Sequence, residues 1–387
     1  MLTTLAIANY RSIKHMVMPL GQLNLVTGAN GSGKSNLYKA LRLLAETAQG
    51  VVIEALAREG GLGSTWWAGP EMSARMQRGD VPIQGQQPNE AKRLRLGFTT
   101  EDFGFAISLG LPIPVPYPTA FMLDPEIKSE GIWGGGAYRP ASLLVERRNA
   151  MVRARDGHGW AVLDQHADSC ESFFNIVGRT RQAPEIGELR AFINGWRFYD
   201  HFRIDREAPC RHPQLGTRSP VLHHDGRNLA SALQTIIEIG DVEDLFAALE
   251  DAFPGSRLAI DAPAGGLFSV RLHQHGLLRP LSGAELSDGT LRYLLLMAAL
   301  LTPRPPSLMV LNEPETSLHT DLLPALARLV IRASRRSQVW VVSHSRVLID
   351  ALTACEGCNV LELEKHQGQT QLRGVGLLDE PLWRWMD

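Results

Sequence analysis

A glycine-rich stretch near the start of the chain has residue types suited to holding phosphate groups. Residues 28–35 read Gly-Ala-Asn-Gly-Ser-Gly-Lys-Ser and fit the pattern G-x-x-x-x-G-K-[ST]. Glycines let backbone N–H groups curl around phosphate oxygens, and a following helix adds the positive end of its dipole. We expect Lys34 to reach the β- and γ-phosphates and Ser35 to ligate Mg²⁺. The alternative is a glycine-rich turn that matches by chance.

The elements on either side of this phosphate loop decide between the two interpretations. Residues 23–28 (LNLVTG) form a short apolar run, which predicts a strand. From Ser35 to about residue 48, apolar residues recur on one helical face, which predicts a helix. Strand, loop and helix in this order are the context that the motif requires. The motif alone does not separate kinases, GTPases and ATPases.

A carboxylate follows a second apolar run. Residues 307–311 have the length of a buried strand and lead into Asn312-Glu313-Pro314-Glu315. A carboxylate at a strand end can face the γ-phosphate and orient the attacking water, so Glu313 is the candidate general base. The alternative is an ordinary polar residue at a strand end.

Two further stretches have patterns that suit phosphate contact. In residues 286–292 (LSDGTLR, here the signature stretch), Ser287 can cap the following apolar helix and Gly289 permits close backbone approach. A capped core helix would show the same pattern. Residues 338–342 (QVWVV) predict a buried strand, followed by His344, which could hydrogen-bond the γ-phosphate. A lone histidine there is more often structural, but its place as the fourth element in this order favours a functional role.

Taken together, the stretches GANGSGKSN, LSDGTLR, LNEPETSLH and VVSHS resemble ABC-type ATPases of the RecF, SMC and OLD branch, and stand-alone bacterial ATPases of the AAA_21 type. Asn9-Tyr10-Arg11-Ser12 resembles the "NFRS" stretch that precedes the phosphate loop in that branch. The resemblance covers roughly residues 1–50 and 280–350, whereas residues 224–229 (HDGRNL) fit more loosely. It implies an α/β fold: a P-loop NTPase head of the ABC type with an antiparallel β lobe and a helical insertion.

The resemblance also implies roles for individual residues, with ATP and Mg²⁺ as cofactors. The residues implied in nucleotide binding are Arg11, Asn30, Gly31, Gly33, Lys34, Ser35 and Asn36, together with Ser287 and Gly289, which would meet the γ-phosphate bound on a second copy. The residues implied in catalysis are Glu313, which would activate water, and His344, which would sense the γ-phosphate. The residues implied near Mg²⁺ are Ser35 and Asn312. Residues 316–319 would lie where two copies meet, and Gln84, Gln86 and Gln87 are candidates for the family's Q-loop glutamine.

Asn312 departs from the family pattern, in which an aspartate precedes the catalytic glutamate. That aspartate accepts hydrogen bonds from Mg²⁺-bound water. Asparagine keeps a carbonyl acceptor but loses the charge. We therefore predict weaker Mg²⁺ binding and slow turnover.

The rest of the chain predicts three parts. Residues 1–183 are expected to form an N-terminal ATPase lobe, with loops over 50–90, a hairpin over 94–109 and further strands near 119–128, 141–147, 151–155 and 160–163. Residues 184–255 are expected to be a mostly helical insertion. Residues 256–387 would form a C-terminal ATPase lobe, in which Trp383 and Trp385 are expected to be packing anchors.

Composition restricts the possible functions. The net charge is -2 over 387 residues, so no global basic field indicates a nucleic-acid partner. No apolar run is long enough for a bilayer, and the start lacks the apolar stretch of a signal peptide, which predicts a cytoplasmic protein without membrane contact. Cys355 and Cys358 form a lone CxxC, more typical of incidental thiols than of a zinc or redox site.

Arginines cluster at Arg147, Arg148, Arg153 and Arg155, in and beside predicted strands, and basic and aromatic residues interleave in residues 195–212. Such stretches suit nucleic-acid contacts. A solvated face with paired acids is the favoured alternative.

Two functions from different classes fit the sequence. The leading hypothesis is an ATPase that binds and slowly hydrolyses ATP between two copies of itself, in DNA maintenance or repair or in phage defence. The DNA link comes from the resemblance alone. The alternative is a nucleotide-switched interaction protein that controls a protein effector without binding DNA. A transporter subunit fits less well because of the β lobe, and a small-molecule kinase would leave the signature stretch unexplained.

Overall fold

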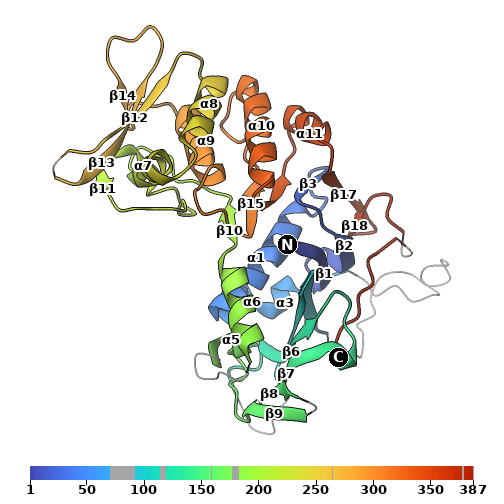
Figure 1. Cartoon of the computed structure of the whole chain (residues 1–387). Coiled ribbons are helices and arrows are strands. Elements are labelled where there is room, and N and C mark those ends of the chain that lie inside the picture. Colours follow the sequence, from blue (N-terminus) through green and yellow to red (C-terminus); the bar gives the residue numbers. More distant parts are fainter. Residues whose placement is uncertain are drawn as a thin grey trace. The chain divides into compact units, whose positions relative to one another are not determined.

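The computed structural model describes residues 1–69, 92–113, 119–157, 159–176, 183–263, 265–376 and 379–386. Figure 1 shows its helices and strands. Contacts within the chain separate two units. Unit 1 comprises residues 1–20, 28–194 and 362–387, and unit 2 comprises residues 21–27 and 195–361.

These units do not follow the three-part division predicted from the sequence. The segment 184–255 is split between them at residue 194, and 195–361 stay together across the expected boundary at 255. Sequence patterns report local secondary structure, whereas the units arise from contacts between distant segments. As a division by function, the three-part scheme stays a prediction.

Unit 1 contains an antiparallel sheet of eight strands. The strands, in spatial order, are β2 (Ile13–Pro19), β1 (Leu2–Tyr10), β4 (Leu94–Thr100), β5 (Phe103–Gly110), β6 (Glu126–Gly134), β7 (Leu143–Arg148), β8 (Met151–Asp156) and β9 (Gly159–Asp164). The expected hairpin over 94–109 is present as β4 and β5, in register Leu96↔Ile107. The strand expected near residues 119–128 lies later in the chain, as β6. Pairing with β5 and β7 holds β6 in the sheet although several of its residues are polar.

Glycines in this sheet make room for large side chains. A Cβ on Gly97 would lie 2.6 Å from the Trp383 ring, and one on Gly131 would lie 2.4 Å from Met386 Sδ. The Trp383 ring contacts Trp133 and Trp385 edge-on, with centroids 5.7 and 5.2 Å away. Trp383 and Trp385 are therefore packing anchors, as the sequence favoured.

The helices of unit 1 are α1 (Lys34–Gln49), α2 (Val52–Arg58), α3 (Gly61–Thr65), α5 (Phe173–Ile176) and α6 (Pro184–Asn194), with a 3₁₀ turn, η1, at Pro140–Ser142. The helix predicted from Ser35 is confirmed as α1. The loops predicted over 50–90 are wrong for residues 52–65, which form α2 and α3. The buried face of α2 (Val52, Ala55, Leu56) has helical spacing, but the segment is too short to show it clearly. Residues 70–91 lie outside the described part.

Unit 2 is built around parallel strands. In spatial order they are β10 (Arg197–Tyr199), β15 (Leu308–Asn312), β16 (Gln338–Val342) and β3 (Leu23–Gly28). The central residues of β3, β15 and β16 are almost fully buried, as expected for a parallel sheet covered on both faces. Because the strands are parallel, their carboxyl ends lie at one edge. The strands predicted at 23–28, 307–311 and 338–342 are confirmed.

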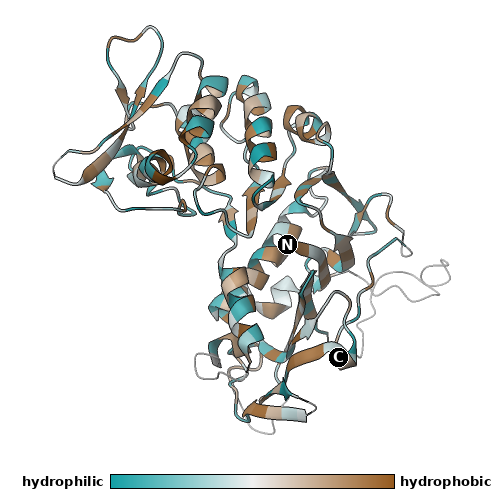
Figure 2. Cartoon of the chain, viewed as in Figure 1, coloured by the Kyte–Doolittle hydropathy of each residue, from teal (hydrophilic) through white to brown (hydrophobic). Residues whose placement is uncertain are grey.

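The helices of unit 2 are α7 (Leu229–Ile239), α8 (Val242–Ala252), α9 (Asp288–Leu300), α10 (Leu323–Ser334) and α11 (Arg346–Thr353), with 3₁₀ turns η3 (Pro209–Arg211) and η4 (Thr320–Leu322). Hydrophilic and hydrophobic residues alternate along α8 and α10 (Figure 2). Their polar sides meet in two ion pairs, Arg328–Asp251 and Arg332–Asp244, each at 2.7 Å. The mostly helical segment expected over 184–255 is wrong for residues 195–228, where β10, η3 and β11 lie between turns.

A smaller antiparallel sheet completes unit 2. Its strands are β11 (Gln214–Leu215), β13 (Leu267–His273), β12 (Arg257–Asp261) and β14 (Leu281–Ser282). In unit 1, β17 (Cys358–His366, which begins in unit 2) forms a hairpin with β18 (Gln369–Leu372). No helix in the described part of the chain combines the length and apolarity needed to cross a bilayer.

Candidate active site

The phosphate loop of unit 1 has a backbone that requires glycine. Gly28, Gly31 and Gly33 have φ of 138°, 80° and 110°, in the region that other residues rarely adopt. The buried Lys34 ammonium reaches back over the loop and donates to the carbonyls of Gly28 (2.7 Å) and Ala29 (3.1 Å). The loop is thus folded around its own lysine, as a phosphate cradle would be.

The start of α1 is suited to an anion. Its N-cap, Gly33, offers no side chain to the first-turn N–H groups, and the first turn carries no acidic residue. The Ser32 hydroxyl is buried and has no hydrogen-bond partner, and the Ser35 side chain is exposed at the first turn. A first turn without a side-chain cap, an unused hydroxyl and a lysine at a long helix's N-terminus fit a phosphate group.

The C-terminal hairpin packs against this loop within unit 1. The Thr370 hydroxyl donates to the Ser32 carbonyl (2.8 Å) and lies 2.7 Å from the Ser12 hydroxyl, which also accepts from the Asn36 amide (2.7 Å). A Cβ on Gly33 would lie 2.1 Å from Thr370 Oγ1, so glycine is required there. Thr370 is fully buried and stands 338 positions from Ser32, so sequence spacing could not reveal its contact.

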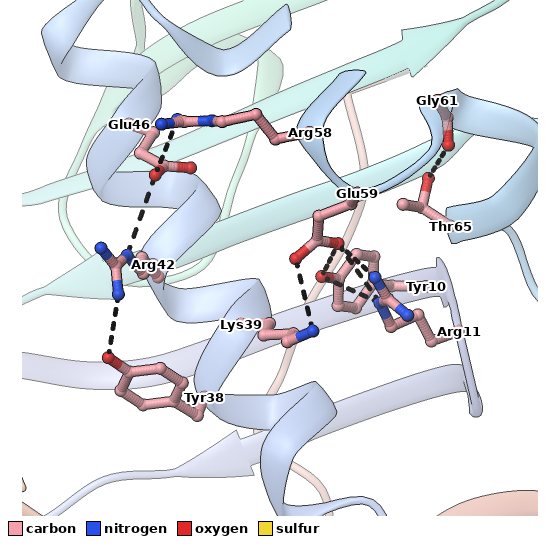
Figure 3. Close-up of polar contacts among 10 residues, drawn as sticks. All are labelled: Tyr10, Arg11, Tyr38, Lys39, Arg42, Glu46, Arg58, Glu59, Gly61 and Thr65. Carbon is pink, nitrogen blue, oxygen red and sulfur yellow. Dashed lines mark hydrogen bonds and ion pairs between the residues drawn. The ribbon is translucent and has the colours of Figure 1, made fainter. Parts of the chain in front are cut away.

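Arg11 belongs to a polar network around Glu59, the residue that follows α2 (Figure 3). It has a left-handed backbone (φ 50°), its N–H donates to the Thr65 carbonyl, and its guanidinium pairs with Glu59 at 2.7 Å. The Tyr10 hydroxyl donates to the same carboxylate (2.8 Å). Burial raises the pKa of Tyr10 well above its usual range, so the phenol stays a neutral donor.

In unit 2, the functional side chains follow the carboxyl ends of neighbouring strands. Glu313 follows β15 and His344 follows β16, and β3 runs directly into the phosphate loop. The Glu313 N–H donates to the Val342 carbonyl (2.8 Å). The His344 Nδ1 atom lies 3.7 Å from Glu313 Oε1, with both side chains about half exposed. The structure therefore brings together the two residues expected to act in catalysis.

A third residue, Glu315, fixes this arrangement and was not singled out from the sequence. Its Oε1 accepts from the Ser343 hydroxyl (2.6 Å) and from the N–H groups of His344 (3.0 Å) and Ser345 (3.2 Å). Its side chain is only 6% exposed, and its second oxygen is buried without a hydrogen-bond partner. The only feature of the sequence that could have indicated Glu315 is that an acidic residue follows Glu313-Pro314.

Asn312 has an acidic neighbour directly after the adjacent strand. Tyr199, the last residue of β10, is in register with Leu311 of β15, so Asp200 follows β10 next to the position of Asn312 at the end of β15. Both line a cavity of about 500 Å³ together with Glu313. The sequence offered Asp200 only as an acid that could pair with neighbouring arginines, and its place beside Asn312 was not predicted because β10 has only three residues and no apolar periodicity.

The signature stretch is held at two points. Ser287 caps α9 by accepting from the Thr290 N–H (3.2 Å), and a Cβ on Gly289 would lie 2.9 Å from the Ser317 carbonyl. The buried Arg211 donates to the carbonyls of Leu286 (2.7 Å) and Gly283 (3.2 Å) and pairs with Asp288. Ser287, Gly289 and Ser317 line an open hollow of about 650 Å³. The sequence placed Arg211 in the basic and aromatic stretch 195–212 but did not reveal its link to the signature stretch, because that link depends on contacts more than 70 positions away.

A family model described as "AAA domain, putative AbiEii toxin, Type IV TA system" matches residues 23–117 and 172–350, more than half of the chain. The chain belongs to this AAA_21 family. Among curated proteins, no sequence matches it.

Two solved structures of SMC heads match this AAA_21 chain over nearly its whole length. One, an SMC head bound to the C-winged helix domain of ScpA, has a TM-score of 0.52 at 15% identity and covers 97% of this chain and 98% of that chain. The other, an SMC head with an extended coiled coil bound to the C-terminal domain of ScpA derived from Pyrococcus furiosus, has a TM-score of 0.50 at 14% identity, covering 97% and 96%. These matches confirm the expected fold, the ABC-type P-loop head that SMC proteins also have.

The roles assigned to individual residues of this AAA_21 protein stay predictions. Asn30, Gly31 and Asn36 lie in or beside the phosphate loop, as expected from the motif. Gln84, Gln86 and Gln87 lie outside the described residues. Among the described residues, no group of three or more His, Cys, Asp or Glu side chains is arranged to hold a metal ion.

The arginines around β7 and β8 are largely engaged with acids. Arg147 is fully buried and pairs with Glu130 (3.2 Å) beneath the sheet. Arg148 and Arg153 share the Glu146 carboxylate. Arg155 and Arg153 both stack on Trp160, with 4.7 and 4.6 Å to the ring centroid. These pairs favour the structural interpretation of the cluster over a nucleic-acid contact.

Proposed function

We propose that this chain binds ATP–Mg²⁺ on its phosphate loop and hydrolyses ATP slowly. The observation that carries the proposal is the phosphate loop itself, with its folded-back Lys34 and the uncapped, acid-free start of α1. Membership of the AAA_21 family and the SMC-head fold support nucleotide binding. Glu313 would orient the attacking water, and the His344 Nδ1 atom, 3.7 Å from its carboxylate, supports a joint role of the two residues.

Mg²⁺, when bound, neutralises charge on the phosphate oxygens. The Ser35 hydroxyl and the Asn312 carbonyl oxygen are the groups of this chain that would hold it or its water. Oxygen donors suit this cation. Because Asn312 lacks the usual negative charge, turnover is expected to be slow.

We further propose that two copies close on two ATP molecules. The exposed Ser287 and its neighbour Gly289, at the start of α9, would contact the γ-phosphate bound on the other copy. ATP would then contact both copies only in the closed dimer, so binding favours closure and hydrolysis favours release.

The leading role for such a dimer is DNA maintenance or phage defence. The family description, which mentions a toxin system, supports the defence role. The alternative is control of a protein effector without DNA. The paired arginines of β7 and β8 and the net charge of -2 favour that alternative, and the two SMC heads are each bound to a domain of a protein partner, ScpA.

The solution mass of Glu313→Gln, with and without ATP–Mg²⁺, tests the dimer. We expect the mass to double with ATP, because the nucleotide binds but is not hydrolysed. Adding Ser287→Arg should abolish the doubling while leaving ATP binding intact. A Glu313→Gln protein that binds ATP and stays a monomer contradicts the dimer, and one that binds no ATP contradicts the whole proposal.

DNA binding by the closed Glu313→Gln dimer separates the two roles. A DNA-binding dimer should show affinity that falls steeply as salt rises, because bound phosphates release counterions. No ATP-dependent DNA binding at low salt would favour the protein-effector alternative.

A further inference from the structure

Arg292 is a charged residue in an otherwise apolar part of α9. It is 5% exposed, and its neighbours from Leu291 to Leu300 are buried hydrophobic residues. Its guanidinium donates to the main-chain carbonyls of Glu313 (3.1 Å) and Pro314 (3.4 Å). The signature helix therefore reaches the turn that carries the proposed general base.

Stability alone does not explain a cation at this position. Burial lowers the pKa of Arg292, which means that the charged form is disfavoured there, although Glu315 and Glu313 offset this effect. Buried charged groups can often be replaced by apolar residues without loss of stability, so their presence raises the question of a specific role.

The turn that Arg292 contacts is conformationally demanding. Glu313 and Ser317 have φ of 49° and 64°, a left-handed backbone that non-glycine residues adopt only when their surroundings hold them. The Glu313 peptide groups are held on both sides: the N–H donates to Val342, and the carbonyl accepts from Arg292. The first turn of α9 makes a second contact with this segment, because Gly289 packs closely against the Ser317 carbonyl.

We propose that Arg292 is a positioning residue that lets the signature helix set the orientation of Glu313. This inference rests on the proposed function. In the proposed dimer, Ser287 at the start of α9 contacts the nucleotide of the second copy, whereas Glu313 acts on the nucleotide of its own copy. Arg292 then links the two nucleotide sites of the dimer, so that closure on one ATP prepares hydrolysis of the other.

The variants Arg292→Met and Arg292→Lys test this role. Methionine keeps much of the side-chain length without the hydrogen bonds, and lysine keeps the charge but cannot bridge two carbonyls in a fork. Arg328→Met is the matched control, since Arg328 of α10 pairs with Asp251 of α8, away from the turn. If Arg292→Met does not fold, Arg292→Lys carries the test.

Two measurements are made on each variant. The first is amide hydrogen exchange of residues 312–318 in the protein without nucleotide, which does not depend on ATPase activity. We expect faster exchange in this turn for both Arg292 variants and unchanged exchange in β16. The second is steady-state hydrolysis, for which we expect kcat to fall at least about tenfold with KM within about twofold, and cooperativity in ATP to disappear.

The outcomes are distinguishable. Unchanged exchange of residues 312–318 in both variants overturns the positioning role, whatever the ATPase data show. Faster exchange with wild-type kcat overturns the link to catalysis. If wild-type protein neither binds ATP nor dimerises, the proposed function fails, while the exchange measurement still decides whether Arg292 holds the turn.

Discussion

The Glu315 carboxylate accepts a hydrogen bond from the Ser343 hydroxyl at 2.6 Å. This contact joins the turn after β15 to the loop after β16, two segments that are separate in sequence and adjacent at the sheet edge. The same oxygen accepts the His344 N–H, so the loop that carries His344 is fixed relative to Glu313. Both proposed catalytic side chains therefore depend on a second carboxylate, Glu315, for their position.

Glu315→Gln tests this dependence. The amide keeps one acceptor but loses the charge that strengthens all three hydrogen bonds, each of which contributes about 1.5–3 kcal/mol when charged. We expect kcat to fall about tenfold or more, with ATP affinity nearly unchanged. Glu356→Gln, at an exposed site of the same unit, is the control. Wild-type kcat in Glu315→Gln would contradict the positioning role.

The part of this site that could be predicted from the sequence is the part encoded locally. The apolar runs at 23–28 and 307–311 marked β3 and β15, and the glycine pattern marked the phosphate loop, because these features depend on neighbouring residues. The contacts of Glu315, Thr370 and Arg211 could not be predicted, because their hydrogen bonds join segments 28 to 338 positions apart.

Other elements were missed for a different reason. The helices α2 and α3 are too short for a helical period to show, and packing rather than propensity stabilises them. The strand β6 has a polar, glycine-containing sequence, and its two neighbours determine its position.

Asn312→Asp should strengthen Mg²⁺ binding and speed hydrolysis. A carboxylate restores the charge that the family pattern places beside Mg²⁺-bound water, and a tenfold effect corresponds to about 1.4 kcal/mol. The measurement is the Mg²⁺ dependence of ATP binding, together with the rate. Asn149→Asp, in an exposed turn of unit 1, is the control.

The prediction for Asn312 can also be tested through Asp200, which lines the same cavity. If Asp200 already supplies the missing charge, Asp200→Asn will weaken Mg²⁺-dependent binding, and adding Asn312→Asp to it will restore binding. Unchanged Mg²⁺ affinity and rate in Asn312→Asp would mean that Asn312 does not limit turnover.

Arg11→Ala should lower ATP affinity, because Arg11 is expected to contact the nucleotide and Glu59 already holds its guanidinium in place. We expect a loss of about tenfold, measured by equilibrium binding of a fluorescent ATP analogue, and a smaller loss in Glu59→Gln. Arg58→Ala, whose side chain is more exposed and pairs with Glu46, is the control. Equal affinity in Arg11→Ala and wild type would remove Arg11 from the nucleotide site.

Thr370→Val should loosen the phosphate loop without a change of side-chain shape. Valine removes the hydroxyl that donates to the Ser32 carbonyl and bonds the Ser12 hydroxyl, which in turn accepts from Asn36. Each such bond contributes about 0.5–1.5 kcal/mol, and a buried acceptor left unpaired costs more. We therefore expect ATP affinity to fall about five- to tenfold.

Thr370→Ser separates the hydrogen bonds from packing, because serine keeps the hydroxyl and loses only the methyl group. Near wild-type affinity in Thr370→Ser and weak binding in Thr370→Val would assign the effect to the hydroxyl, with Thr353→Val at an exposed helix end as the control. Equal losses in both Thr370 variants would instead point to the methyl contact over Gly33. Full affinity in Thr370→Val would show that the phosphate loop keeps its shape without the C-terminal hairpin's hydroxyl.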